Sequence, residues 1–127
     1  MPNKLDDFVK NYSDLKNIVN LALNKKAIEL NVLDVRGLSS ITDYFVICSG
    51  RSEPQVKAIG DHIRKGTTKK PHHIEGYENQ NWILLDYFDI LVHVFKNEER
   101  KYYNIERLWA DAPINKYHNE KSKVPIK

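Results

Sequence analysis

Apolar side chains recur with the period of an α-helix in two segments of the chain, residues 13–24 and 52–66. The repeating positions are Leu15, Ile18, Val19 and Ala22 in the first segment and Val56, Ile59, Gly60 and Ile63 in the second. Ser13 can cap the first helix, and Ser52 with Gln55 forms a capping box at the start of the second. Each segment is therefore predicted to be a helix with one buried face.

Strand-like patterns occupy five shorter segments, which are residues 30–35, 44–49, 73–75, 82–87 and 90–96. The second of them is apolar at almost every position, which is typical of a strand covered on both faces. Only Phe88 and Asp89 separate the last two strands, so these are predicted to be antiparallel neighbours. A final helix is predicted from Asn97, its N-cap, to Pro113. Its apolar stripe is Tyr102, Ile105, Leu108 and Trp109. The pattern predicts an α/β domain with a mixed β-sheet of about five strands packed with helices.

Length and composition fit a single folded domain. The chain has 127 residues, of which 41% are hydrophobic, and its mean hydropathy is −0.59. We expect an N-terminal extension over residues 1–12, a domain over residues 13–113 and a disordered basic tail over residues 114–127. One cysteine excludes a disulfide framework within the chain. Because no membrane span or signal segment is evident, a cytoplasmic location is expected.

The net charge of +3 lies in the predicted tail, since residues 114–127 contain four lysines and one glutamate. The predicted domain is therefore neutral, which argues against a strongly basic nucleic-acid-binding surface. The five histidines show no metal-ligand spacing. His93 lies between Val92 and Val94 and is expected to be a core or interface residue, and Cys48 lies in the most apolar strand and is expected to be buried and unreactive.

One segment raises the alternative of an enzyme. Ser49 and Gly50 end a predicted strand just before a helix, where free backbone N–H groups can hold a phosphate. Nucleotidyltransferases combine such a turn with two metal-binding carboxylates at positions i and i+2 of a strand, which share a face. Asp86 and Asp89 are three residues apart and are predicted to point to different sides. We therefore expect no catalytic residues, no metal and no cofactor, and nucleotide binding at Ser49 and Gly50 stays as the alternative.

Aromatic side chains are concentrated near the last two strands and the last helix. They are Trp82, Tyr87, Phe88, Tyr102, Tyr103 and Trp109. One helix and one sheet face cannot bury all of them, and Tyr and Trp are enriched where proteins bind one another. The surplus favours a binding module over an enzyme.

Several long motifs resemble the ribosomal silencing factor (Iojap) family. They are VLDVRGL at residues 32–38, TDYFVICSG at 42–50, QVKAI at 55–59, WILLDY at 82–87, VHVF at 92–95, and the segment 102–113 with its YY and LWADAP motifs. The resemblance implies a nucleotidyltransferase-like fold without the catalytic carboxylates. It also implies a translation repressor that binds the large ribosomal subunit through universal protein fourteen and sterically blocks the small subunit. Family members also form homodimers, and glycine is usual in the family where Gln80 and Phe88 stand here.

Within this resemblance, we expect the contact with the ribosomal protein on and around the strand 82–87. Trp82, Leu84 and Asp86 alternate along the strand and share a face. Burial of that face in the core would also bury Asp86 without an evident cationic partner, which is costly. The expected interface residues are Trp82, Leu84, Asp86, Tyr87, Asp89 and Tyr102. The basic tail, which lies outside the family motifs, is expected to make a minor contact with ribosomal RNA.

Overall fold

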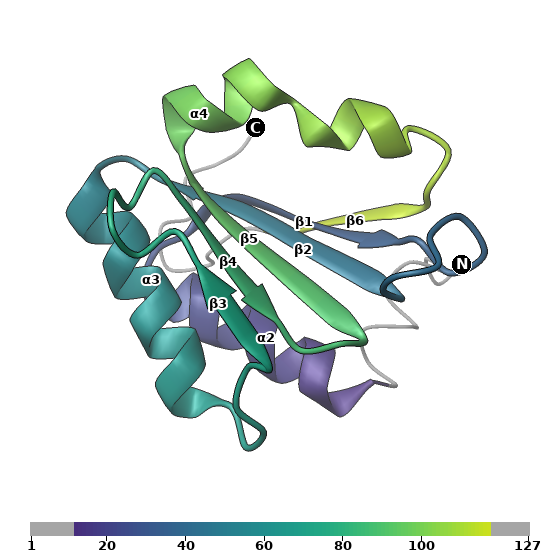
Figure 1. The fold of residues 1–127 in the computed structure, drawn as a ribbon, viewed down its shortest axis with the longest axis horizontal. Coiled ribbons are helices and arrows are strands. Elements are labelled where there is room, and N and C mark those ends of the chain that lie inside the picture. Colours follow the sequence, from purple (N-terminus) through teal and green to yellow (C-terminus); the bar gives the residue numbers. More distant parts are fainter. Residues whose placement is uncertain (1–11, 118–127) are drawn as a thin grey trace.

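The computed structural model describes residues 12–117, which form one six-stranded mixed sheet with helices on both faces (Figure 1). The elements are α2 (Ser13–Asn24), β1 (Ile28–Asp34), β2 (Tyr44–Gly50), α3 (Glu53–Gly66), β3 (His73–Glu75), β4 (Trp82–Asp86), β5 (Ile90–Lys96), α4 (Asn97–Tyr103), the 3-10 helix η1 (Ile105–Trp109) and β6 (Ile114–Tyr117). The strand order is β3-β4-β5-β2-β1-β6. Only β2 and β5 pair in parallel, and every other pair is antiparallel. The predicted α/β class with a mixed sheet is confirmed, with six strands rather than about five.

The two faces of the sheet differ in how they are covered. Helices α2 and α3 lie on one face, where their apolar sides and the sheet form the larger core cluster. Helix α4 and η1 lie over the opposite face, above a smaller cluster of buried residues. That smaller cluster consists of Leu33, Val35, Phe45, Ile47, Phe95 and Ala112. All seven residues of β2 are buried because this strand is covered on both faces, as its apolar pattern predicts.

Of the helices α2, α3 and α4, only α3 begins with a side-chain cap. At α3 the Ser52 hydroxyl accepts the N–H of Gln55 at 3.3 Å, and the Gln55 side chain accepts the N–H of Arg51 at 2.7 Å. The predicted Ser52 cap is therefore confirmed, and the Gln55 side chain reaches back as predicted, to the N–H of the residue before the N-cap. The predicted caps Ser13 and Asn97 are wrong, because each is already the first helical residue and no side chain caps either helix.

The predicted last helix is divided at Asn104. This residue has a left-handed backbone with φ of 45°, which ends α4 and starts η1. Asparagine tolerates this conformation better than most residues, because its short polar side chain can bond locally. The prediction of one continuous helix from Asn97 to Pro113 is wrong at this point.

The predicted boundary of the tail is also wrong, because residues 114–117 form the edge strand β6. Its register pairs Ile114 with Leu33 and Lys116 with Asn31 of β1, and Asn115 is buried. Pairing with β6 satisfies backbone groups of β1 that an open sheet edge would leave unpaired. The remainder of the predicted tail and residues 1–11 lie outside the described residues.

Candidate protein-binding surface

Strand β4 presents alternate residues to the two faces of the sheet. Ile83 and Leu85 are fully buried under α2 and α3, whereas Trp82, Leu84 and Asp86 are half-buried on the opposite face. The predicted alternation is therefore confirmed. The face that carries Trp82 is the one that α4 and η1 cover.

An aromatic row extends from the sheet to the exposed side of α4. The Trp82 ring stacks on Phe95 at 4.6 Å between centroids and contacts Tyr103 at 4.9 Å. Tyr103 in turn meets the edge of Tyr102 at 5.0 Å. Tyr102 is 79% exposed, so the row ends in solvent. We call Trp82, Leu84, Asp86, Tyr102 and Tyr103 together the β4–α4 surface.

The Trp82 side chain is held in place by a hydrogen bond to His93. The indole N–H of Trp82 donates to His93 Nδ1 at 3.1 Å, so the neutral imidazole carries its proton on Nε2. Burial lowers the pKa of His93 to about 4, and the nearby Glu106 carboxylate offsets only part of that effect. The imidazole is therefore neutral near pH 7. This histidine is a core residue, in agreement with the sequence-based expectation.

Asp86 adds a negative charge to the β4–α4 surface. Its Oδ1 accepts the backbone N–H of Phe88 at 2.8 Å, which braces the β4–β5 turn. None of the ion pairs among residues 12–117 involves Asp86. A half-buried carboxylate outside these ion pairs, on the same face of β4 as Trp82, can accept a basic group from another molecule.

Phe88 and Gln80 hold left-handed backbone conformations, with φ of 73° and 62°. These are the two positions at which the resemblance led us to expect glycine, the residue that adopts positive φ most readily. The turns before and after β4 therefore keep a glycine-like backbone although both residues carry side chains.

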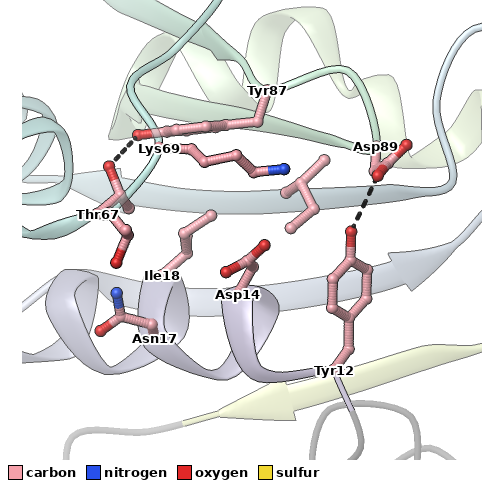
Figure 2. Close-up of a pocket in the computed structure, with 10 residues that line it drawn as sticks. Tyr12, Asp14, Asn17, Ile18, Thr67, Lys69, Tyr87 and Asp89 are labelled. Atoms are coloured by element: carbon pink, nitrogen blue, oxygen red, sulfur yellow. Dashed lines mark hydrogen bonds between the residues drawn. The ribbon is translucent and has the colours of Figure 1, made fainter.

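Tyr87 and Asp89 point away from the β4–α4 surface, toward α2 (Figure 2). The Tyr87 hydroxyl bonds to the Thr67 hydroxyl at 3.0 Å, and the Tyr12 hydroxyl donates to Asp89 at 3.3 Å. Burial, followed by the charge of Asp89, raises the pKa of Tyr12 to about 12. The cavity between these groups has a volume of about 20 Å³, enough for one water molecule. The six residues expected at one interface thus lie on two sides of the sheet.

The turn proposed for phosphate binding is occupied by the protein's own side chains. The Ser49 hydroxyl is buried and accepts a hydrogen bond from Arg100 at 2.9 Å. The N–H groups of Arg51 and Gln55 are bound within the capping box. Because Asp86 and Asp89 point to opposite faces, they do not form a paired carboxylate site. Within residues 12–117 no cluster of His, Cys, Asp and Glu could hold a metal ion.

Cys48 and Arg100 are two further buried residues with reactive or charged side chains. Cys48 is fully buried, and burial raises the pKa of its thiol to about 12, so it is unreactive as expected. Arg100 is 7% exposed and donates hydrogen bonds to Glu29, Ser49 and Glu106. Neither spacing nor composition in the sequence pointed to it.

No helix of residues 12–117 is both long and apolar enough to cross a membrane.

Comparison with known proteins agrees with the motifs. A family model described as "Ribosomal silencing factor during starvation" matches residues 10–126. Ribosomal silencing factor RsfS of Halalkalibacterium halodurans is 44% identical over 108 residues, covering 83% of this chain and 92% of that protein. A crystal structure of a Bacillus halodurans protein superposes with a TM-score of 0.71 at 40% identity, covering 81% of this chain and 96% of that one.

A further match is more distant in sequence. The mouse protein named "Mitochondrial assembly of ribosomal large subunit protein 1" is 29% identical over 103 residues, which are 76% of this chain and 45% of the mouse protein. The family model spans nearly the whole chain, and the RsfS relative covers most of both sequences. The chain therefore belongs to the ribosomal silencing factor family.

Proposed function

We propose that this protein represses translation by binding the large ribosomal subunit through the β4–α4 surface and blocking the approach of the small subunit. The partner on the large subunit is universal protein fourteen. The family supports a role in ribosome silencing, and the name of the mouse relative supports a role at the large subunit. The observation that carries the assignment to this surface is the row of rings that runs from Trp82 to the exposed Tyr102. Leu84 and Asp86 lie on the same face of β4 as Trp82, and none of the ion pairs among the described residues involves Asp86.

The chemistry of the β4–α4 surface suits a basic protein partner. Large aromatic side chains supply apolar contact area with little loss of conformational entropy, and a carboxylate can pair with Lys or Arg of the partner. The repression is steric, so it needs no catalytic residue, metal or cofactor. A particle in which the two subunits are already joined should bind the protein weakly, because the effect of one ligand on the other is reciprocal.

Variants on and off the surface test the proposal by co-sedimentation with purified subunits. Tyr102 and Ile41 are both 79% exposed, so alanine at either position should leave stability nearly unchanged. We expect Tyr102→Ala to weaken binding to large subunits by about tenfold and Ile41→Ala by less than about twofold. Asp86→Lys should weaken binding further through charge repulsion. Equal binding to large subunits and to joined ribosomes would contradict the steric mechanism.

Trp82→Ala is expected to cost about 2 kcal/mol of binding free energy or more, the usual scale for a central aromatic residue. Because Trp82 also stacks on Phe95 and bonds to His93, this variant should lose folding stability as well. Thermal melts must therefore accompany its binding measurement.

A homodimer, which the resemblance implies, is tested on the same variants by sedimentation velocity. If Tyr102→Ala dissociates the dimer, dimerisation and ribosome binding use one surface.

A further inference from the structure

Helix α4 and η1 form a short arm, residues 97–109, that lies across the face of the sheet opposite α2 and α3 (Figure 1). Among these residues only Arg100 is buried. Ile105 and Trp109 are half-buried, whereas Tyr102, Tyr103 and Leu108 are exposed. The arm therefore carries part of the β4–α4 surface, and the residue that it buries most deeply is charged.

Arg100 links the arm to two strands of the sheet. Its Nη1 donates to the carbonyl oxygen of Glu29 at 2.7 Å and to the Ser49 hydroxyl at 2.9 Å. Its Nε and Nη2 donate to the two carboxylate oxygens of Glu106, at 3.2 and 2.7 Å. Asn31 of β1 also donates to Glu106. The Arg100 guanidinium thus joins α4, η1, β1 and β2 at one point.

The ion pair also spans the break in the arm. Arg100 lies before Asn104 and Glu106 lies after it, so the two-oxygen contact fixes the angle between α4 and η1. A helix of seven residues is too short to be stable on its own. A planar guanidinium bound in a fixed geometry specifies orientation more strictly than apolar contact does.

Glu106 stays ionised although it is partly buried. Partial burial by itself would raise the pKa of this carboxyl, but the hydrogen bond and charge of Arg100, with Asn31 and Lys116, hold the pKa below its ordinary value. The carboxylate is therefore ionised near pH 7, and the ion pair is intact there.

We propose that Arg100 is a positioning residue for partner recognition: it fixes the arm so that Tyr102 and Tyr103 stand in the orientation that the ribosomal protein binds. This inference rests on the proposed function, because it concerns the same surface. A buried ion pair often adds little net stability and instead selects one arrangement among several. Among residues 12–117 the side-chain hydrogen bonds of Arg100 go to Glu29, Ser49 and Glu106, none of which belongs to the β4–α4 surface. Its effect on binding would therefore act through the position of the arm.

The first experiment compares Arg100→Met with Ile59→Ala. Ile59 is fully buried in the core cluster of the opposite face, so its replacement destabilises the protein without touching the arm. Dissociation constants for purified large subunits are measured at a temperature at which both variants are folded by circular dichroism. We expect Arg100→Met to weaken binding about tenfold and Ile59→Ala to stay within about twofold of the unaltered protein. Unchanged binding by Arg100→Met would overturn the inference.

The second experiment repeats Arg100→Met in a chain that already carries Tyr102→Ala and Tyr103→Ala. If Arg100 acts by placing these two rings, its replacement should now weaken binding less than about twofold, because no rings remain to be placed. An equal loss in both backgrounds would show a general structural role and overturn the inference. If Tyr102→Ala with Tyr103→Ala binds normally, the surface itself is wrong and the proposed function falls too. If that pair weakens binding and Arg100→Met does not, only the positioning role falls.

Discussion

At the scale of single residues, two glycines share a backbone conformation but not an environment. Gly37 and Gly76 have φ of 83° and 93°, values that cost other residues conformational energy. A methyl group at Gly37 would meet no atom within 4 Å, whereas one at Gly76 would overlap the carbonyl oxygen of Trp82. Gly76 is thus required both by its dihedral angles and by the close approach of the β3–β4 connection to β4.

Alanine at Gly37 and alanine at Gly76 carry a similar backbone cost, because both residues have positive φ. Comparing the two variants therefore isolates the steric cost at Gly76. Gly37→Ala should lower the free energy of unfolding by about 1 kcal/mol, the cost of a left-handed non-glycine residue. Gly76→Ala should cost about 3 kcal/mol or more, because steric overlap is added to the same dihedral cost. Urea unfolding followed by circular dichroism measures both. Equal losses would mean that the β3–β4 connection can move aside freely.

At the scale of elements, β6 shows how a short edge strand completes a sheet. Its four residues pair with β1, and Asn115 and Tyr117 also contact the rest of the protein. Its sequence, Ile-Asn-Lys-Tyr, is too short and too polar to be recognised as a strand without its partner. The strand is held by pairing with β1, not by its own propensity.

Two truncated chains separate β6 from the lysine-rich residues that follow it. A chain ending at residue 117 should unfold at the same urea concentration as the full chain. A chain ending at residue 113 should unfold at a markedly lower urea concentration, because β1 loses its pairing partner.

The chain ending at residue 117 also tests the expected contact between the tail and ribosomal RNA. Its association with large subunits should be slower at low salt and nearly normal at physiological salt. A loss of binding at both salts would place the main site in the tail.

At the scale of the whole molecule, stability depends on pH through His93, which is buried against Phe45 and Phe95 of the smaller core cluster. Desolvation holds the folded pKa near 4, below the unfolded value of about 6.5, so the unfolded chain binds the proton more readily. Stability from this group is therefore complete above about pH 6.5 and is lost as the pH falls toward 4. The shift corresponds to about 3 kcal/mol in total.

Urea unfolding at several pH values between 7 and 5 measures this dependence. Carboxylates contribute mainly below this window, because their unfolded pKa values are near 4. His93→Phe removes the titrating group, so its stability should change much less across the window, although it also loses the acceptor for Trp82 and starts from a lower value. Parallel curves for the two proteins would show that another group is responsible.

The sequence by itself determined the elements whose signals are local. Helical periodicity located α2 and α3, the capping box placed the start of α3, and alternation assigned Trp82 and Leu84 to the face opposite Ile83. The spacing of Asp86 and Asp89 also predicted correctly that they point to different sides. These features depend on residues within a few positions of one another, so their energies can be read from short segments. The long motifs likewise identified the family, because their order and spacing are specific.

Only the tertiary structure decided which segments lie together. Pairing of β6 with β1 joins residues 81 to 87 positions apart, and Arg100 becomes a buried residue only because Glu29, Ser49 and Glu106 converge on it. Tyr87 and Asp89 were grouped with Trp82 by proximity along the chain, but partners just before α2 and just after α3 draw them to the opposite face. Long-range contacts of this kind depend on the free energy of the assembled sheet, which no short segment contains.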